Sequence, residues 1–178
     1  MSWSEMATSR RALLLVAGFA LVAAGCGFRL QGAAAGLPAG VKSVYVSAPE
    51  DLTPFVIELE RGLNGAGAGR APSAGVADAV IRVLHDRTGR RVLSVSTRNT
   101  PQEYEVFYSV EYAIDRAGQE AVPVQRLELT RNFSFDESLL LAKDHEESIL
   151  REAMARDLAD LVLRRLGSLP PAQTGPSR

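Results

Sequence analysis

The chain has 178 residues, and 20 Lys and Arg against 21 Asp and Glu give it a formal net charge of −1. A net charge near zero supplies no bulk attraction to nucleic acid, so a nucleic-acid partner is not expected. The single cysteine allows no internal disulfide and no thiolate metal site, so the fold must be held by its hydrophobic core.

The first 25 residues have the parts of a signal peptide. Arg10 and Arg11 precede an apolar run over residues 12–24, which is too short for a transmembrane helix. Ala23-Ala24-Gly25-Cys26 resembles the lipobox of bacterial lipoproteins, although Ala23 stands where that family usually has Leu. The sequence therefore predicts cleavage before Cys26, with the alternative of an ordinary signal peptide followed by a free or buried cysteine.

The lipobox resemblance implies how the mature chain is anchored. Cys26 would carry an S-diacylglycerol and an N-acyl chain such as palmitate, and several acyl chains hold a protein stably in a membrane. Gly27 after the cysteine, in place of Asp, implies sorting to the periplasmic side of the cell outer membrane. Export by the general secretory route or, because of Ser9-Arg10-Arg11, by the twin-arginine route stays open.

The first half of the mature chain predicts a tether, a strand and a helix. Residues 26–40 are rich in Gly and Ala without a period and predict the tether, and residues 41–168 predict a single domain. Residues 41–46 are β-branched and predict a strand. Thr53-Pro54 predicts a helix start. The apolar positions of this helix are Leu52, Phe55, Leu59 and Leu63, and residues 65–75 predict a loop.

The second half predicts extended structure and a last helix. Residues 78–87 predict a strand with Ala79, Ile81, Val83 and His85 on one face. Residues 88–91 predict a turn, and residues 92–97 predict a return to extended structure. Apolar and polar residues alternate most clearly over residues 103–115, which predicts a half-buried antiparallel strand. Its buried positions are expected to be Tyr104, Val106, Tyr108, Val110, Tyr112 and Ile114. A turn at residues 116–119 is expected to lead into a second strand over residues 122–135.

The last helix is predicted to start at Asp144, where Glu147 completes a capping-box pattern. Its apolar stripe is expected to comprise Leu150, Met154, Leu158, Leu161 and Leu166, and residues 169–178 predict a disordered tail. These elements predict an α+β fold, a two-layer sandwich with two helices packed on one face of a mixed four-stranded sheet. The other face, with Glu103, Glu105 and Glu111, would meet water or a partner.

A catalytic site is not expected. His85 and His145 are the only histidines, and packing and capping explain them better than a metal site. The glycines at 65, 67 and 69 follow a helix and lack the Lys-Ser/Thr end of a phosphate-binding loop, so they predict a linker. No nucleophile with a base is found, which argues against a periplasmic hydrolase, and no cofactor is implied.

Arginines are concentrated between residues 82 and 98. The arginines are at positions 82, 87, 90, 91 and 98, and Asp86 is the only acidic residue in this stretch. Guanidinium groups suit phosphate, which favours a phosphate-bearing ligand. Solvated charges that protect the edge of a sheet from aggregation explain the cluster equally well.

Three segments together resemble the LptE family of lipopolysaccharide-assembly lipoproteins. They are Cys26-Gly27-Phe28-Arg29-Leu30, Arg98-Asn99-Thr100-Pro101-Gln102-Glu103-Tyr104 and Leu141-Ala142-Lys143-Asp144-His145-Glu146. The resemblance implies a non-enzymatic outer-membrane protein that plugs and helps to assemble the β-barrel LptD. It also implies binding of lipopolysaccharide during its insertion into the outer leaflet.

Within that family, basic residues before the long strand and at the entry to the last helix are linked to lipopolysaccharide binding. The matching positions here are Arg98 and Lys143, and the nearby Arg90 and Arg91 are added as candidates. The alternative is an auxiliary lipoprotein of a periplasmic ABC-type lipid-trafficking system, which would also be a small α/β domain on a lipid anchor.

Overall fold

The computed structural model describes residues 36–134 and 140–170, with the backbone alone for 133, 134 and 140–143. The predictions for the signal peptide, for Cys26, for residues 26–35 of the tether and for the tail after Pro170 lie outside these residues. In the described part of the chain, no helix combines the length and the apolar character needed to cross a membrane.

Strand β1 (Ser43–Ser47) and helix α2 (Pro54–Gly65) form where the sequence predicts them. Thr53 caps α2, because its Oγ1 accepts the Val56 N–H at 3.3 Å, and Pro54 occupies the first turn. The buried residues of α2 are Phe55, Val56, Leu59 and Leu63. Leu52 precedes the cap and is 85% exposed, so its assignment to the apolar stripe is wrong.

Residues 65–75 are more ordered than the predicted loop. They contain the short strand β2 (Gly69–Arg70) and lead into a 3-10 turn, η1 (Ala74–Val76). β2 pairs in parallel with β1, and the Gly69 N–H donates to the Lys42 carbonyl at 2.7 Å. The sheet therefore has five strands in the order β2-β1-β3-β4-β5, and the prediction of four is wrong. A two-residue strand is too short to show a hydrophobic pattern.

β1 and β3 (Ala79–Val95) are parallel neighbours, as predicted for a strand-helix-strand crossover. Asp78 fixes the start of this pairing, since its carboxylate accepts the N–H groups of Lys42 and Ser43, both at 2.9 Å. These hydrogen bonds, together with one from the Ser43 hydroxyl, hold the pKa of Asp78 below its ordinary value.

β3 runs without the turn that was predicted at residues 88–91. Gly89 lies opposite Phe107, and a Cβ at Gly89 would come within 2.7 Å of the Phe107 ring, so the glycine makes room for an aromatic side chain. The Thr88 hydroxyl donates to the Phe107 carbonyl at 3.0 Å and binds the two strands together. A glycine beside a polar residue predicts a turn, but here it serves cross-strand packing.

A register shift between Val83 and His85 changes which face each later residue of β3 takes. The side chain of His85 is therefore 57% exposed and lies 3.8 Å from Glu111, so its placement on the apolar face is wrong. After the shift, Asp86 and Arg90 pair with Val110 and Val106, which are buried on the helix side of the sheet.

β4 (Pro101–Arg116) and β5 (Gln119–Ser134) complete the antiparallel part of the sheet. The alternation predicted for β4 is confirmed, and Tyr108 and Tyr112 are among the largest fully buried side chains. β4 returns to β5 through Ala117 and Gly118, which have φ angles of 51° and 74°. Positive φ at both central residues is the type I′ geometry that matches the twist of two strands.

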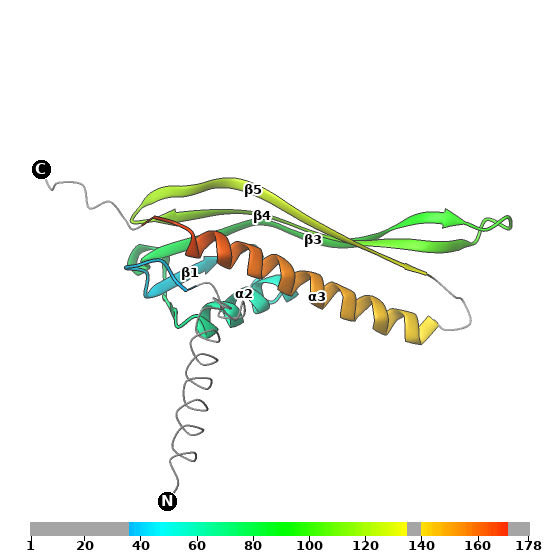
Figure 1. Ribbon diagram of the computed structural model, residues 1–178, viewed down its shortest axis with the longest axis horizontal. Coiled ribbons are helices and arrows are strands. Elements are labelled where there is room, and N and C mark those ends of the chain that lie inside the picture. The colour runs from blue at the N-terminus through cyan, green and yellow to red at the C-terminus, as the bar shows by residue number, and fades with distance from the viewer. Residues whose placement is uncertain (1–35, 135–139, 171–178) are drawn as a thin grey trace, which may run out of the picture. The chain divides into compact units, whose positions relative to one another are not determined.

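Helix α3 (Leu140–Gly167) begins one turn before the predicted start at Asp144. Met154, Leu158 and Leu166 are buried as predicted, whereas Leu161 is 36% exposed and lies at the edge of the stripe. Both helices lie on the same side of the sheet (Figure 1), and one core cluster joins them to β1, β3 and β4. The predicted two-layer α+β arrangement is thus confirmed apart from the number of strands.

Candidate functional site

Arg98 lies in the loop that joins β3 to β4, and this loop is held by its own hydrogen bonds. The Ser96 N–H donates to the Thr100 carbonyl at 2.7 Å, and the Asn99 N–H donates to the Ser96 carbonyl at 2.9 Å. The Ser96 hydroxyl accepts the N–H groups of Arg98 and Thr100, both at 3.2 Å. Asn99 takes a φ of 62°, which Asn tolerates better than most residues. The loop therefore presents Arg98 on a defined backbone.

The Arg98 side chain is exposed, and no hydrogen bond or ion pair joins it to another described side chain. Its guanidinium is therefore available to an incoming anion without the loss of an internal partner. Arginine offers several donors in a planar fork that matches phosphate oxygens. Of the sequence-predicted candidates whose side chains are described, Arg98 is the most accessible to a phosphate.

Arg90 lies on β3 on the side that carries the helices. Its Nη1 is 3.2 Å from Glu147 of α3, and its guanidinium carbon lies 5.2 Å from the centre of the Tyr104 ring. The Glu147 side chain is only 8% exposed and is also bound by Arg151, one turn later on the same helix. Arg90 therefore joins α3 to the sheet, and it shares the Glu147 carboxylate with Arg151.

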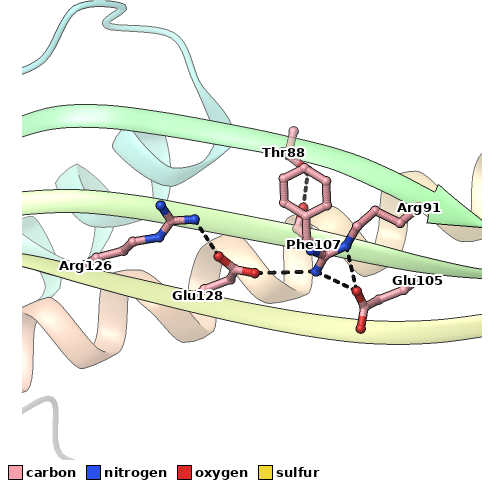
Figure 2. A network of polar contacts seen from close by, with 6 residues as sticks. All are labelled: Thr88, Arg91, Glu105, Phe107, Arg126 and Glu128. Carbon is pink, nitrogen blue, oxygen red and sulfur yellow. Dashed lines mark hydrogen bonds and ion pairs between the residues drawn. The ribbon is translucent and has the colours of Figure 1, made fainter.

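Arg91 points to the opposite side of the sheet, because neighbouring residues of a strand alternate. Its Nη2 lies 2.6 Å from Glu105 and 3.5 Å from Glu128, and its guanidinium stacks 5.0 Å from the centre of the Phe107 ring. Figure 2 shows this group with Arg126, whose Nη2 is 2.7 Å from Glu128. Arg91 is thus the centre of a network that crosses three strands.

The network on this open face continues beyond Figure 2. Glu111 lies 3.7 Å from Arg126 and 3.8 Å from His85. The hydrogen bond from Arg126 lowers the pKa of Glu128, and the same contact raises the pKa of Arg126. Three carboxylates and two arginines therefore lie in ion-pair contact across β3, β4 and β5, with the His85 imidazole beside Glu111, which gives the face a polar surface of mixed charge.

Lys143 lies in the first turns of α3, and its side chain is outside the described residues. It precedes Glu147 by four residues, or about one helical turn, so the contact between Arg90 and Glu147 fixes the part of α3 that carries Lys143. The structure therefore separates the four candidates. Arg98 lies in a loop without a partner among the described side chains, Arg90 supports α3, and Arg91 belongs to the opposite face.

Sequence reasoning missed Glu147 and Phe107 as partners of these arginines. In the sequence, the position of Glu147 indicates only part of a helix cap, whereas in the structure two arginines around it explain why an acid is buried there. Among the described residues there is no group of three His, Cys, Asp or Glu side chains that could hold a metal ion. His145 is exposed at the start of α3.

The buried tyrosines belong to the core. The Tyr108 hydroxyl accepts the Phe55 N–H at 3.2 Å and so ties α2 to β4. Burial and the nearby Asp86 carboxylate raise the pKa of Tyr108 far above neutral pH. Burial likewise raises the pKa of Tyr112, so both hydroxyls stay protonated and serve packing.

Comparison with known sequences identifies similar proteins over most of the chain. The sequence model of the LptE family, described as lipopolysaccharide-assembly, matches residues 41–166. An LPS-assembly lipoprotein LptE from Pectobacterium atrosepticum is 26% identical over 158 residues, which are 88% of this chain and 85% of that protein. A second from Yersinia enterocolitica is 24% identical over 158 residues, or 88% of this chain and 75% of that protein.

Solved structures share the same fold. An uncharacterized lipoprotein B from Nitrosomonas europaea is 31% identical with a TM-score of 0.67, and the match covers 80% of this chain and 91% of that one. The rare lipoprotein B from Shewanella oneidensis is 25% identical with a TM-score of 0.63, covering 71% of this chain and 94% of that one. The two-layer fold of this chain thus has counterparts among bacterial lipoproteins.

Proposed function

Because this chain belongs to the LptE family of lipopolysaccharide-assembly lipoproteins, we propose that it plugs and helps to assemble the β-barrel LptD in the outer membrane. In this proposal it also binds lipopolysaccharide while that lipid is inserted into the outer leaflet. Acyl chains on Cys26 would hold it on the periplasmic side, close to the barrel. The protein would act by contact and positioning, without a chemical step of its own.

The observation that carries the proposed ligand binding is the free guanidinium of Arg98 on an ordered loop. Lipid A carries phosphates, and a cation without an internal partner can bind one at no cost in broken ion pairs. Lys143 would supply a second cation from α3. Arg90 and Arg91 would have to exchange a carboxylate partner before binding phosphate, so the proposal gives them a smaller share.

The open face of the sheet supports the proposed fit inside a barrel. The lumen of a large outer-membrane barrel is lined by polar side chains, because its strands alternate apolar residues toward the lipid with polar ones toward the interior. A sheet face on which Arg91, Glu105, Glu128 and Arg126 balance one another can meet such a wall with these four charges already paired.

Ligand binding is tested by reversing the two proposed cations. Arg98→Glu with Lys143→Glu should weaken binding of purified lipopolysaccharide by about tenfold or more, because two attractive phosphate contacts become repulsive. Arg70→Glu with Arg164→Glu is the matched control, since it makes the same change of charge at two other exposed positions. If both double variants bind equally well, Arg98 and Lys143 have no special role.

Partner binding is tested by co-purification from outer membranes with a tag on this chain. We expect LptD to be recovered with it, and depletion of the chain should reduce lipopolysaccharide at the cell surface. Recovery of no outer-membrane barrel would contradict the plug. A change in phospholipid balance alone after depletion would favour the auxiliary lipoprotein of an ABC-type system instead.

A further inference from the structure

The end of β3 carries a concentration of exposed apolar side chains. Val92, Leu93 and Val95 are 49%, 48% and 51% exposed, and we call them, with the loop of residues 96–100, the hairpin tip. Nine large apolar side chains are exposed in the described part of the chain, and three of them fall within these four consecutive positions. Scattered exposed apolar residues need no explanation, but a cluster indicates a contact surface.

The fold explains why these side chains find no place in the core. β1 pairs with β3 only from Ala79 to Arg82, so the later part of β3 has no strand on that side within the described residues. Register shifts between Val92 and Ser94 and again between Ser94 and Val95 interrupt the alternation that would turn every second residue inward. Figure 1 shows the end of β3 and its loop extending past the start of α3.

The loop that follows this apolar cluster carries an exposed cation, Arg98. Arg98 follows Val95 by three residues and has no side-chain partner among the described residues, whereas the nearby acid, Glu103, accepts a hydrogen bond from the Ser94 hydroxyl at 2.9 Å. The tip thus combines apolar surface with a positive charge that no other described side chain pairs. The complementary ligand is an amphiphile with an anionic head beside an acyl chain.

We propose that the hairpin tip is an acyl-chain contact site, at which Val92, Leu93 and Val95 touch a fatty-acyl chain of a phosphorylated glycolipid while Arg98 binds its phosphate. The inference rests on the proposed function, because it names the part of lipopolysaccharide that this surface recognises. A phosphate site alone would leave the exposure of the three apolar side chains unexplained. A ligand with both parts accounts for the cation and the apolar cluster together.

The test compares two probes and a variant that changes polarity but little else. Val92→Thr, Leu93→Thr and Val95→Thr are combined, since Thr retains the preference for extended structure. The control is Val76→Thr with Val124→Thr, which alters side chains that are 64% and 54% exposed elsewhere on the molecule. The probes are purified lipopolysaccharide and the same material with its acyl chains removed chemically and its phosphates retained.

We expect the wild type and the control to bind the acylated probe more tightly than the deacylated one. The triple variant should bind the acylated probe about tenfold more weakly than the wild type, because apolar contact is lost, and the deacylated probe unchanged. Arg98→Glu should weaken binding of both probes. Each threonine is also introduced singly, so that binding of the two probes can still be compared with the wild type if the triple variant does not fold.

Wild-type affinity for the acylated probe in the triple variant would overturn the inference and leave the proposed function standing. Equal binding of the two probes by the wild type would do the same. Loss of LptD co-purification by the triple variant with unchanged lipid binding would assign the tip to a protein contact instead. If the wild type binds neither probe, the proposed lipopolysaccharide binding itself fails.

Discussion

The neighbours of an arginine decide what its charge can do in this protein. Arg98 has no described side-chain partner and is open to a ligand, whereas Arg91 is enclosed by Glu105, Glu128 and the Phe107 ring. Both belong to the same arginine-rich stretch, and composition could not tell them apart. The pairing of β3 with β4, which brings residues 14 apart in sequence into contact, supplies the difference.

Ala117 is a residue whose backbone conformation does not suit its side chain. It occupies the first central position of the type I′ turn with a φ of 51°, where a Cβ is disfavoured and where Asn before Gly is preferred. Ala117→Asn should raise the free energy of unfolding by about 0.5–1 kcal/mol, as measured by chemical denaturation. Ala66→Asn, at a cap with a φ of −81°, should bring no such gain. An equal effect at both positions would contradict this explanation.

At the scale of elements, the sequence predicts well where one hydrophobic pattern continues. The alternation in β4 and the cap of α2 each depend on neighbouring residues, and both are confirmed. The errors fall where pairing between strands overrides local preference. Gly89 alone suggests a turn, but in the structure it makes room for the Phe107 ring on the neighbouring strand. The register shift before His85 moves the later residues of β3 to the opposite faces, and no local sequence pattern indicates it.

The first half of α3 is joined to the sheet by charge as well as by packing, which gives a prediction for this element. Arg90→Glu should place two acids together at the buried Glu147 and lower the free energy of unfolding by about 2 kcal/mol. Hydrogen exchange should accelerate in residues 144–152. The triple exchange Arg90→Glu, Glu147→Arg and Arg151→Glu reverses all three charges, so both attractive pairs return and most of the loss should be recovered.

A second pair between the sheet and α3 provides the control for this prediction. Arg131 lies 3.4 Å from Asp157, but the two side chains are 50% and 54% exposed. Reversing Arg131 to Glu should cost about 0.5 kcal/mol or less, since exposed ion pairs contribute little. If Arg90→Glu is equally mild, or if the exchange fails to recover stability, charge does not hold α3 in place.

At the scale of the whole domain, one buried arginine connects the two ends of the folded chain. Arg116, at the end of β4, is 8% exposed, and it donates to the carbonyl of Ala39 at 2.6 Å and to the carbonyl of Pro170. Leu37 and Leu169 pack against the core beside these carbonyls in sequence. Residues near the first and the last described positions of the chain are therefore held to one another through Arg116.

Removing this connection should loosen both ends together. Arg116→Ala breaks two charge-assisted hydrogen bonds made by a buried guanidinium, so we expect a loss of about 2–4 kcal/mol in the free energy of unfolding. Hydrogen exchange should accelerate near residue 41 and near residue 169 alike. Arg82→Ala is the control, because Arg82 lies on the neighbouring strand but pairs with the side chains of Asp115 and Glu120. Faster hydrogen exchange near only one of these residues would show that the two ends are held independently, which would contradict the role given to Arg116.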